Sequence, residues 1–388
     1  MNIVELALII AALWGNAVLW LKVLDNLLGH EMSRQLMTYG KLFVLLLFCL
    51  LPFWLAHWYL GADQRLVDQL LQWKLSLPFV YVMLCWAIAV WTAPQFLLPH
   101  RGDDKLVLIS NHTTMVDIGA KLEGPGTAGG LAQFFASLPG NQILHLLIHK
   151  EKIRIPRLPR PLEGLSITHI SDLHFTGGVT KSFFEEVVRQ ANALAGDIIA
   201  ITGDIVDREA CFDWLPDTLG QLQAAHGVYF VLGNHDTRVD SDRLRQQLAQ
   251  CGLVDLGGRW IETELRGQKI VLAGNELPWF RPAPDLSDCP DRKGGGPLRI
   301  LLAHSPDQLR WARRHNFDLM LAGHTHGGQI HLPWTGPVVS ATRIGTDYAA
   351  GLRSAPPTVL HVSRGISQTV PLRLRCPPEL ARLTLYGG

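Results

Sequence analysis

The chain has 388 residues, which is long enough for one large domain and a second region. Its 35 Lys and Arg residues almost balance its 34 Asp and Glu residues, so no overall basic field points to a nucleic acid as partner. Hydrophobic residues make up 48% of the chain, charged residues make up only 18%, and the apolar excess is concentrated near the N-terminus. This distribution indicates an integral membrane protein.

Three apolar segments near the N-terminus are predicted to cross a membrane as helices. Residues 42–60 and 79–98 contain no Asp, Glu, Lys or Arg, and each is close to the roughly 20 residues that a helix needs to cross a bilayer. Residues 3–21 are apolar apart from Glu5 and Asn16 and lack the basic start and the small-residue cleavage site of a signal peptide. This first segment is therefore expected to remain as an uncleaved helix.

The basic residues around these segments indicate an orientation. The first loop and the stretch after the third segment carry more of them than the second loop does; in that order they are Lys22, Arg34 and Lys41, then Arg101 and Lys105, then Arg65 and Lys74. Under the positive-inside rule, the first loop and everything after residue 100 are predicted to be cytoplasmic. The expected location is an inner or plasma membrane.

Residues 101–160 are predicted to connect the transmembrane region, residues 1–100, to the domain that follows. Three side chains in this interval are of metal-ligand types but follow no strand-like run, and they are Asn111, His112 and Asp117. His112 is therefore interpreted as a structural residue. Basic residues alternate with prolines over residues 153–161, which indicates an extended linker, either lying on anionic lipid headgroups or simply solvated.

From Leu165 onward, strand-like runs alternate with loops and with segments of helical spacing. The expected strands cover residues 165–170, 197–202, 228–232, 269–273, 299–303 and 318–322, and the expected helices cover residues 181–194 and 241–250. Such alternation predicts a layered α/β domain over residues 161–388.

Five of these apolar runs lead into side chains that commonly bind metals. The blocks are Ser171-Asp172-Leu173-His174, Gly203-Asp204, Gly233-Asn234-His235-Asp236, Ala303-His304 and Gly323-His324-Thr325-His326. Ligands of open α/β sheets bind at the carboxyl ends of the strands, so these blocks are expected to meet. Imidazoles, carboxylates and one carboxamide, without a thiolate, suit two ions of Mn, Fe or Zn better than Mg. Two ions about 3.5 to 4 Å apart form the kind of site that promotes in-line attack on phosphorus.

Taken together, the five blocks resemble the signature of the calcineurin-like metallophosphoesterases. The resemblance implies a layered β-sandwich flanked by helices, with two divalent ions at one end. It places Asp172, His174 and His326 on one ion, Asn234, His304 and His324 on the other, and Asp204 between the two ions.

The same resemblance implies catalytic roles. His235 would protonate the leaving group, with Asp207 fixing its tautomer and keeping it protonated near neutral pH. Arg208 would grip a phosphate oxygen, and a hydroxide that bridges the ions would attack phosphorus without a covalent intermediate. Asp236 is interpreted as a turn residue that caps the following segment. Residues 293–296, with Trp279 and Phe280 upstream, are interpreted as a mobile lid.

The C-terminal stretch resembles the membrane-associated branch of the same superfamily, through Gly328 to Pro333, Tyr348 to Leu352 and Val362 to Ile366. The expected activity is hydrolysis of a phosphodiester or pyrophosphate bond, in a lipid or in a lipid-linked nucleotide sugar such as UDP-diacylglucosamine. Two alternatives stay open: an enzyme that acts on soluble nucleotides, and a catalytically silent membrane scaffold.

Overall fold

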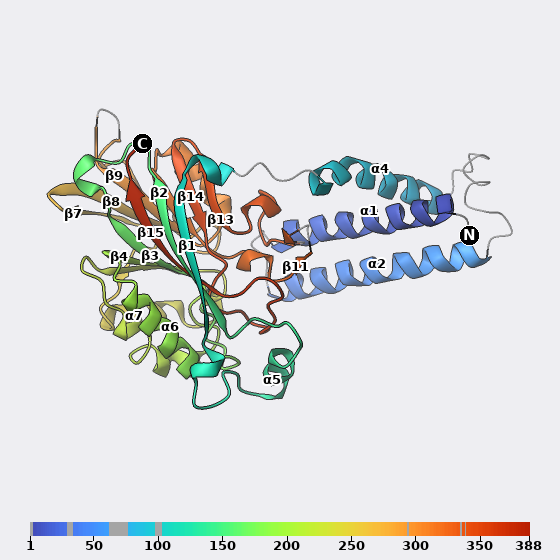
Figure 1. The fold of residues 1–388 in the computed structure, drawn as a ribbon, viewed down its shortest axis with the longest axis horizontal. Coiled ribbons are helices and arrows are strands. Elements are labelled where there is room, and N and C mark those ends of the chain that lie inside the picture. The colour runs from blue at the N-terminus through green and yellow to red at the C-terminus, as the bar shows by residue number, and fades with distance from the viewer. Residues whose placement is uncertain are drawn as a thin grey trace. The chain divides into compact units, whose positions relative to one another are not determined.

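The computed structural model describes residues 3–28, 34–61, 77–97, 103–292, 295–333, 336–337 and 339–388 (Figure 1). The chain divides into two compact units, residues 1–101 and residues 102–388. Each unit has its own hydrophobic core, and the two are described separately.

The first unit consists of the apolar helices α1 (Ile3–Leu28), α2 (Arg34–Gly61) and α4 (Leu77–Leu97). By length and composition, two helices among the described residues could cross a membrane, through Ile3–Leu27 and Gln35–Trp54. The third expected span falls on α4, whose apolar stretch, Phe79–Ala93, is shorter. Of the basic residues that indicated the orientation, Arg65, Lys74 and Arg101 lie outside the described residues.

Polar side chains within these helices are hydrogen-bonded between α1 and α4. The Tyr81 hydroxyl donates to Asn16 Oδ1 at 2.5 Å and accepts from Trp20 Nε1 at 3.2 Å. Trp86 Nε1 donates to the carbonyl of Leu8 at 2.7 Å. Because a bilayer offers no water to such groups, pairing them inside the helix bundle removes the cost of burying them.

The second unit is a sandwich of two mixed sheets. The first sheet has the order β1 (Leu108–Asp117), β2 (His145–Arg154), β15 (Glu379–Tyr386), β3 (Ser166–Ile170), β4 (Ile198–Thr202), β5 (Val228–Val231) and β6 (Val254–Asp255). The second has the order β13 (Gly351–Ala355), β14 (Thr358–Val362), β10 (Leu319–Ala322), β9 (Leu298–Ala303), β8 (Gln268–Asn275) and β7 (Trp260–Leu265). A small hairpin joins β11 (His331–Leu332) and β12 (Gly336–Pro337).

Helices cover the outer faces of the central strands in both sheets, which explains why most of these strands, such as β4, β9 and β10, are largely apolar. In β4, Ile198 and Ala200 belong to the core shared with the second sheet, whereas Ile199 and Ile201 belong to the core shared with α6 (Lys181–Ala193) and α7 (Ser241–Gln250). Figure 1 shows these two helices beside the first sheet. Helix α8 (Leu309–Arg314) packs on the outer face of the second sheet. Strands buried on both faces are rich in apolar residues. The predicted layered fold is confirmed.

The interval that was expected to be a connector is instead part of the sandwich. Strands β1 and β2 pair with each other, and β2 pairs with β15, while helix α5 (Gly130–Ala136) lies in their connection. In β2 the exposed Lys152 alternates with the buried Glu151 and Ile153, as expected for a strand. Because one of the buried residues is charged, this alternation does not appear as a hydrophobic pattern in the sequence. The linker interpretation of residues 153–161 is also wrong, because Ile155 and Leu158 are buried between the sheets.

Candidate metal centre

Five strand ends from the two sheets meet at one end of the sandwich. Asp172 and His174 follow β3, Asp204 follows β4, and Asn234 and His235 follow β5, all in the first sheet. The second sheet contributes His304, at the end of β9, and His324 and His326, after β10. Because β3, β4 and β5 run parallel, as do β9 and β10, their carboxyl ends share one edge of each sheet.

The backbone at this edge adopts an unusual conformation. Positive φ angles occur at five of the converging residues, Asp172 (52°), His174 (47°), Asp204 (52°), His324 (72°) and His326 (51°). A left-handed conformation costs a residue with a side chain roughly 1–3 kcal/mol, and it persists only where the surrounding structure imposes it. Gly203 (φ 89°) relieves one crowded point, since a Cβ there would lie 2.7 Å from His304 Nδ1. Such strain indicates a functional site.

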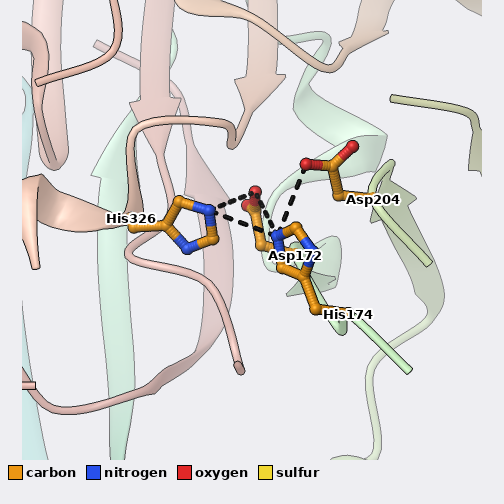
Figure 2. Close-up of side chains that lie close together, drawn as sticks. All are labelled: Asp172, His174, Asp204 and His326. Carbon is orange, nitrogen blue, oxygen red and sulfur yellow. Dashed lines mark hydrogen bonds and ion pairs between the residues drawn. The ribbon is translucent and has the colours of Figure 1, made fainter. Parts of the chain in front are cut away.

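Four of these side chains offer ligand atoms that could hold one metal ion, and we call them the first donor group (Figure 2). His174 Nε2 lies 3.4 Å from Asp204 Oδ2 and 3.2 Å from His326 Nε2. His326 Nε2 lies 3.6 Å from Asp172 Oδ1. All four side chains are buried, and their donor atoms lie within 4.8 Å of one another. Separations of this size fit donors that surround one cation at bonds of about 2.0–2.2 Å.

A second donor group lies on the other side of Asp204. Asp204 Oδ1 is 3.3 Å from His304 Nε2, which is 3.2 Å from His324 Nδ1 and 3.0 Å from Asn234 Oδ1. Asp204 therefore belongs to both groups and directs one oxygen toward each. The structure thus brings together all seven residues for which the sequence predicted metal binding.

The outward nitrogens of the imidazoles are held by acceptors of the chain. His304 Nδ1 donates to the carbonyl of Thr202 at 2.7 Å, His326 Nδ1 donates to that of Ser367 at 3.1 Å, and His174 Nδ1 donates to Asp207 Oδ2 at 2.7 Å. With the proton fixed there, each ring directs a lone pair at Nε2 into a donor group, as metal-binding histidines do. His324 Nε2 is buried and has no hydrogen-bond partner among the described residues.

The electrostatics of the two groups also favour a cation. Burial lowers the pKa of His304, but Asp204 and Asp172 outweigh burial and raise the pKa to about 9. Although burial raises the pKa of Asp204, His304 and His235 hold that pKa well below its usual range. The two carboxylates thus attract positive charge into a buried space, and a divalent ion supplies that charge in place of a proton.

Asp207 holds two histidines at once. Its Oδ1 lies 2.5 Å from His235 Nδ1, and its Oδ2 accepts from His174, so one carboxylate fixes both tautomers. Burial raises the pKa of Asp207, but hydrogen bonds from both rings lower it further, and Asp207 is ionised. Burial also lowers the pKa of His235, although the nearby carboxylates of Asp204 and Asp207 act in the opposite direction.

The two arginines that adjoin Asp207, one in the sequence and one in space, make different contacts. The Arg208 side chain is exposed, and its guanidinium makes no hydrogen bond or ion pair with any residue that the structure describes. Arg238, which the sequence did not single out, donates from Nη1 to Asp207 Oδ1 at 2.8 Å. Its Nη2 lies 3.1 Å from His235 Nε2.

Asp236 does not cap the segment that follows it. Its side chain is fully buried, and Oδ1 accepts from the backbone N–H groups of Ile205 and Val206, both at 2.9 Å. Its Oδ2 accepts from the N–H of Gly233 at 2.8 Å. Asp236 thus ties the loop after β5 to the loop after β4, and the interpretation as a capping residue is wrong.

Arg373 is a second buried residue that supports the site. Its guanidinium donates to three backbone carbonyls, those of His326 at 3.0 Å, Arg364 at 2.7 Å and Ser367 at 2.9 Å. It thereby ties the loop that carries His326 to the chain after β14. No local motif marks Arg373, because its partners lie apart from it in the sequence.

Two aromatic residues were interpreted as part of a lid. The Trp279 ring lies against two donor-group imidazoles, with centroid distances of 5.3 Å to His304 and 5.0 Å to His324. Phe280 packs on the core of the first sheet, under the guanidinium of Arg245. Residues 293–294 of the expected lid lie outside the described residues.

Comparisons with known proteins agree with this geometry. The calcineurin-like phosphoesterase family model matches residues 165–328, which contain all five blocks. The metallophosphoesterase YkuE of Bacillus subtilis is 30% identical over 280 residues, covering 69% of this chain and 94% of YkuE. The chain belongs to the calcineurin-like phosphoesterase family. This membership makes it a metal-dependent phosphoesterase, and its domain implies divalent metal ions.

Other relatives in the family carry further names. The phosphodiesterase YaeI of Escherichia coli is 29% identical over 224 residues, covering 56% of this chain and 81% of YaeI. A transmembrane protein with metallophosphoesterase domain from Bos taurus is 30% identical over 255 residues, covering 61% of this chain and 56% of that protein. The transmembrane relative and the two long apolar helices suggest that this phosphoesterase is associated with a membrane.

Proposed function

We propose that this phosphoesterase is a membrane-anchored dinuclear hydrolase that cleaves a phosphodiester or pyrophosphate bond. The observation that carries the proposal is the position of Asp204, whose two oxygens face separate donor groups. Asp204 would lie between the ions, with Asp172, His174 and His326 holding one ion and Asn234, His304 and His324 holding the other. Donors of nitrogen and oxygen without a thiolate favour manganese, with iron and zinc as the other candidates.

When bound, two such ions supply a water of lowered pKa and neutralise charge on the phosphoryl oxygens. Asp207 holds Nδ1 of His235. The other ring nitrogen, Nε2, is then the one that would face the leaving oxygen. The negative charge of a bound phosphate ester raises the proton affinity of His235, so that Nε2 can pass a proton to that oxygen.

The substrate class that we propose is a lipid or a lipid-linked nucleotide sugar such as UDP-diacylglucosamine. The support is the apolar first unit, which would hold the second unit near a bilayer and raise the effective concentration of membrane substrates. Lys22 and Lys41 lie beside the first loop and support a cytoplasmic position for that loop. With α4 as a third span, the second unit would lie on the same side of the membrane.

The test of the metal centre is hydrolysis of bis-p-nitrophenyl phosphate by the full chain in detergent. Wild type, Asp204→Asn and the exposed-site control Asp213→Asn are each stripped of metal and resupplied with Mn. We expect activity to return in wild type and in the control, and to stay at least about 100-fold lower in Asp204→Asn. A folded, Mn-loaded wild type that hydrolyses neither this diester nor a phosphomonoester would refute the proposal.

The test of the lipid substrate uses UDP-diacylglucosamine in mixed micelles. We expect kcat/KM for this lipid to exceed that for UDP-glucose by at least about tenfold, and to fall as neutral detergent dilutes the lipid in the micelle surface. Equal kcat/KM values for the two substrates would assign the enzyme to soluble nucleotides instead.

A further inference from the structure

Arg238 occupies the place beside His235 where a leaving group would bind. A guanidinium carries five N–H donors and no acceptor. At the contact of 3.1 Å with Arg238 Nη2, His235 Nε2 must therefore be the acceptor. The proton of the ring then lies on Nδ1, which faces Asp207 at 2.5 Å.

This contact must change when substrate binds. An oxygen of the leaving group cannot approach His235 Nε2 while Arg238 Nη2 is bonded to the same lone pair. The bond from Arg238 Nη1 to Asp207 Oδ1 can persist, because it uses the other branch of the guanidinium. Arg238 Nη1 thus stays bonded to Asp207, while Nη2 moves away from His235.

A displaced guanidinium needs a new acceptor, and an anionic phosphate oxygen is a stronger one than a neutral imidazole. The Arg238 side chain is 38% exposed, so a ligand can reach it from solvent. Only two of its five N–H groups are used in contacts with the described residues. The remaining three can bind a phosphate.

We propose that Arg238 binds a charged leaving group and makes this site prefer pyrophosphate bonds over phosphodiesters with uncharged leaving groups. The inference rests on the proposed function, in which His235 faces the leaving oxygen. In a pyrophosphate the leaving group is itself a phosphate, and its oxygens lie where Arg238 can reach them. In a simple diester the same place holds an alkyl or aryl group without charge.

The reaction is a hydrolysis without any change of oxidation state. The oxygen of water bonds to one phosphorus, and the bond from that phosphorus to the bridging oxygen breaks. The bridging oxygen leaves on the second phosphate, giving two phosphate monoesters. The protons of water pass to the products and the solvent, with His235 as the carrier to the leaving oxygen.

The experiment compares diadenosine pyrophosphate with bis-p-nitrophenyl phosphate as substrates of the Mn-loaded full chain. Arg238→Ala is expected to lower kcat/KM for the pyrophosphate about 10- to 150-fold, the range for a lost hydrogen bond to a charged group, and for the diester less than fivefold. Arg259→Ala is the matched control, because Arg259 is also exposed and ion-paired with an aspartate, Asp255. This control is expected to leave both values unchanged.

Each outcome supports or overturns the inference. Equal losses on both substrates would reduce Arg238 to a positioning residue for His235 and overturn it, as would a wild type that cleaves only the diester. A wild type inactive on both substrates would instead count against the proposed function. If Arg238→Ala does not fold, Arg238→Lys replaces it. We then expect a higher inhibition constant for inorganic pyrophosphate, while kcat/KM for the diester stays close to that of wild type.

Discussion

Removing the carboxylate of Asp236 should separate two loops that carry the metal centre. In Asp236→Ala, the N–H groups of Ile205, Val206 and Gly233 lose their acceptor inside a fully buried space. An unsatisfied buried donor costs about 1–3 kcal/mol, so three of them would cost roughly 3–9 kcal/mol. Burial and Asp204 raise the pKa of Asp236 to about 7, and relief of that buried charge offsets part of the loss. We therefore expect a destabilisation of about 3–6 kcal/mol.

Urea unfolding of the full chain in detergent, followed by tryptophan fluorescence, measures this effect. Trp214 packs 5.6 Å from Phe175, inside the core that carries the site, and reports on it. Asp236→Asn keeps one oxygen acceptor but places an amide donor against another donor, so we expect an intermediate loss of about 1–3 kcal/mol. The exposed-site control Asp213→Ala should change stability by less than about 0.5 kcal/mol. An Asp236→Ala protein within 1 kcal/mol of wild type would refute the reasoning.

Three further predictions concern pH, a buried arginine and metal removal. Burial lowers the pKa of His169 and of His361 to about 3, so below pH 6.5 the unfolded chain takes up protons that the folded chain excludes. At pH 5 each ring should therefore lower the free energy of unfolding by about 2 kcal/mol. The urea midpoint should be lower at pH 5 than at pH 7.5, and His169→Gln should remove part of that difference. Arg373→Met should release the loop of His326, lowering kcat/KM at least about tenfold and reducing bound metal by elemental analysis, whereas the exposed-site control Arg375→Met should do neither. Dialysis against a chelator should lower the melting temperature and Mn should restore it, because metal at about 1,000 times its Kd stabilises by about 4 kcal/mol; an unchanged melting temperature would contradict a metal-filled core.

The predicted parts of the fold are those whose residues face the same environment along a whole segment. Strand β4 is apolar at every position before its last residue, Thr202, because both of its faces are covered, so residues 197–202 identified it almost to the residue. Strand β2 was missed because Lys150 and Lys152 alternate with buried side chains at one side of the sheet. Its partner β15 joins it only in the folded chain, and no short-range pattern reports such a pairing.

The same distinction applies to the site. The blocks around Asp204 and His326 could be found because each contains its chemistry within a few residues. Arg238 and Arg373 could not, because their roles depend on contacts that the fold creates with Asp207 and with the His326 loop. Asp236 lay inside a recognised block, yet its partners belong to the neighbouring strand end and only the structure identifies them.

The position of β15 determines when the first sheet can be completed during translation. This strand lies between β2 and β3, so both neighbours are made long before the segment that joins them (Figure 1). About 200 residues separate β3 from β15, and at about 5–20 residues per second their synthesis takes roughly 10–40 seconds. During that interval the facing edges of β2 and β3 lack their partner strand, and they are open to chaperones or to wrong pairing. The first sheet, whose strands β3, β4 and β5 lead into the metal centre, can therefore be completed only after β15 has been translated.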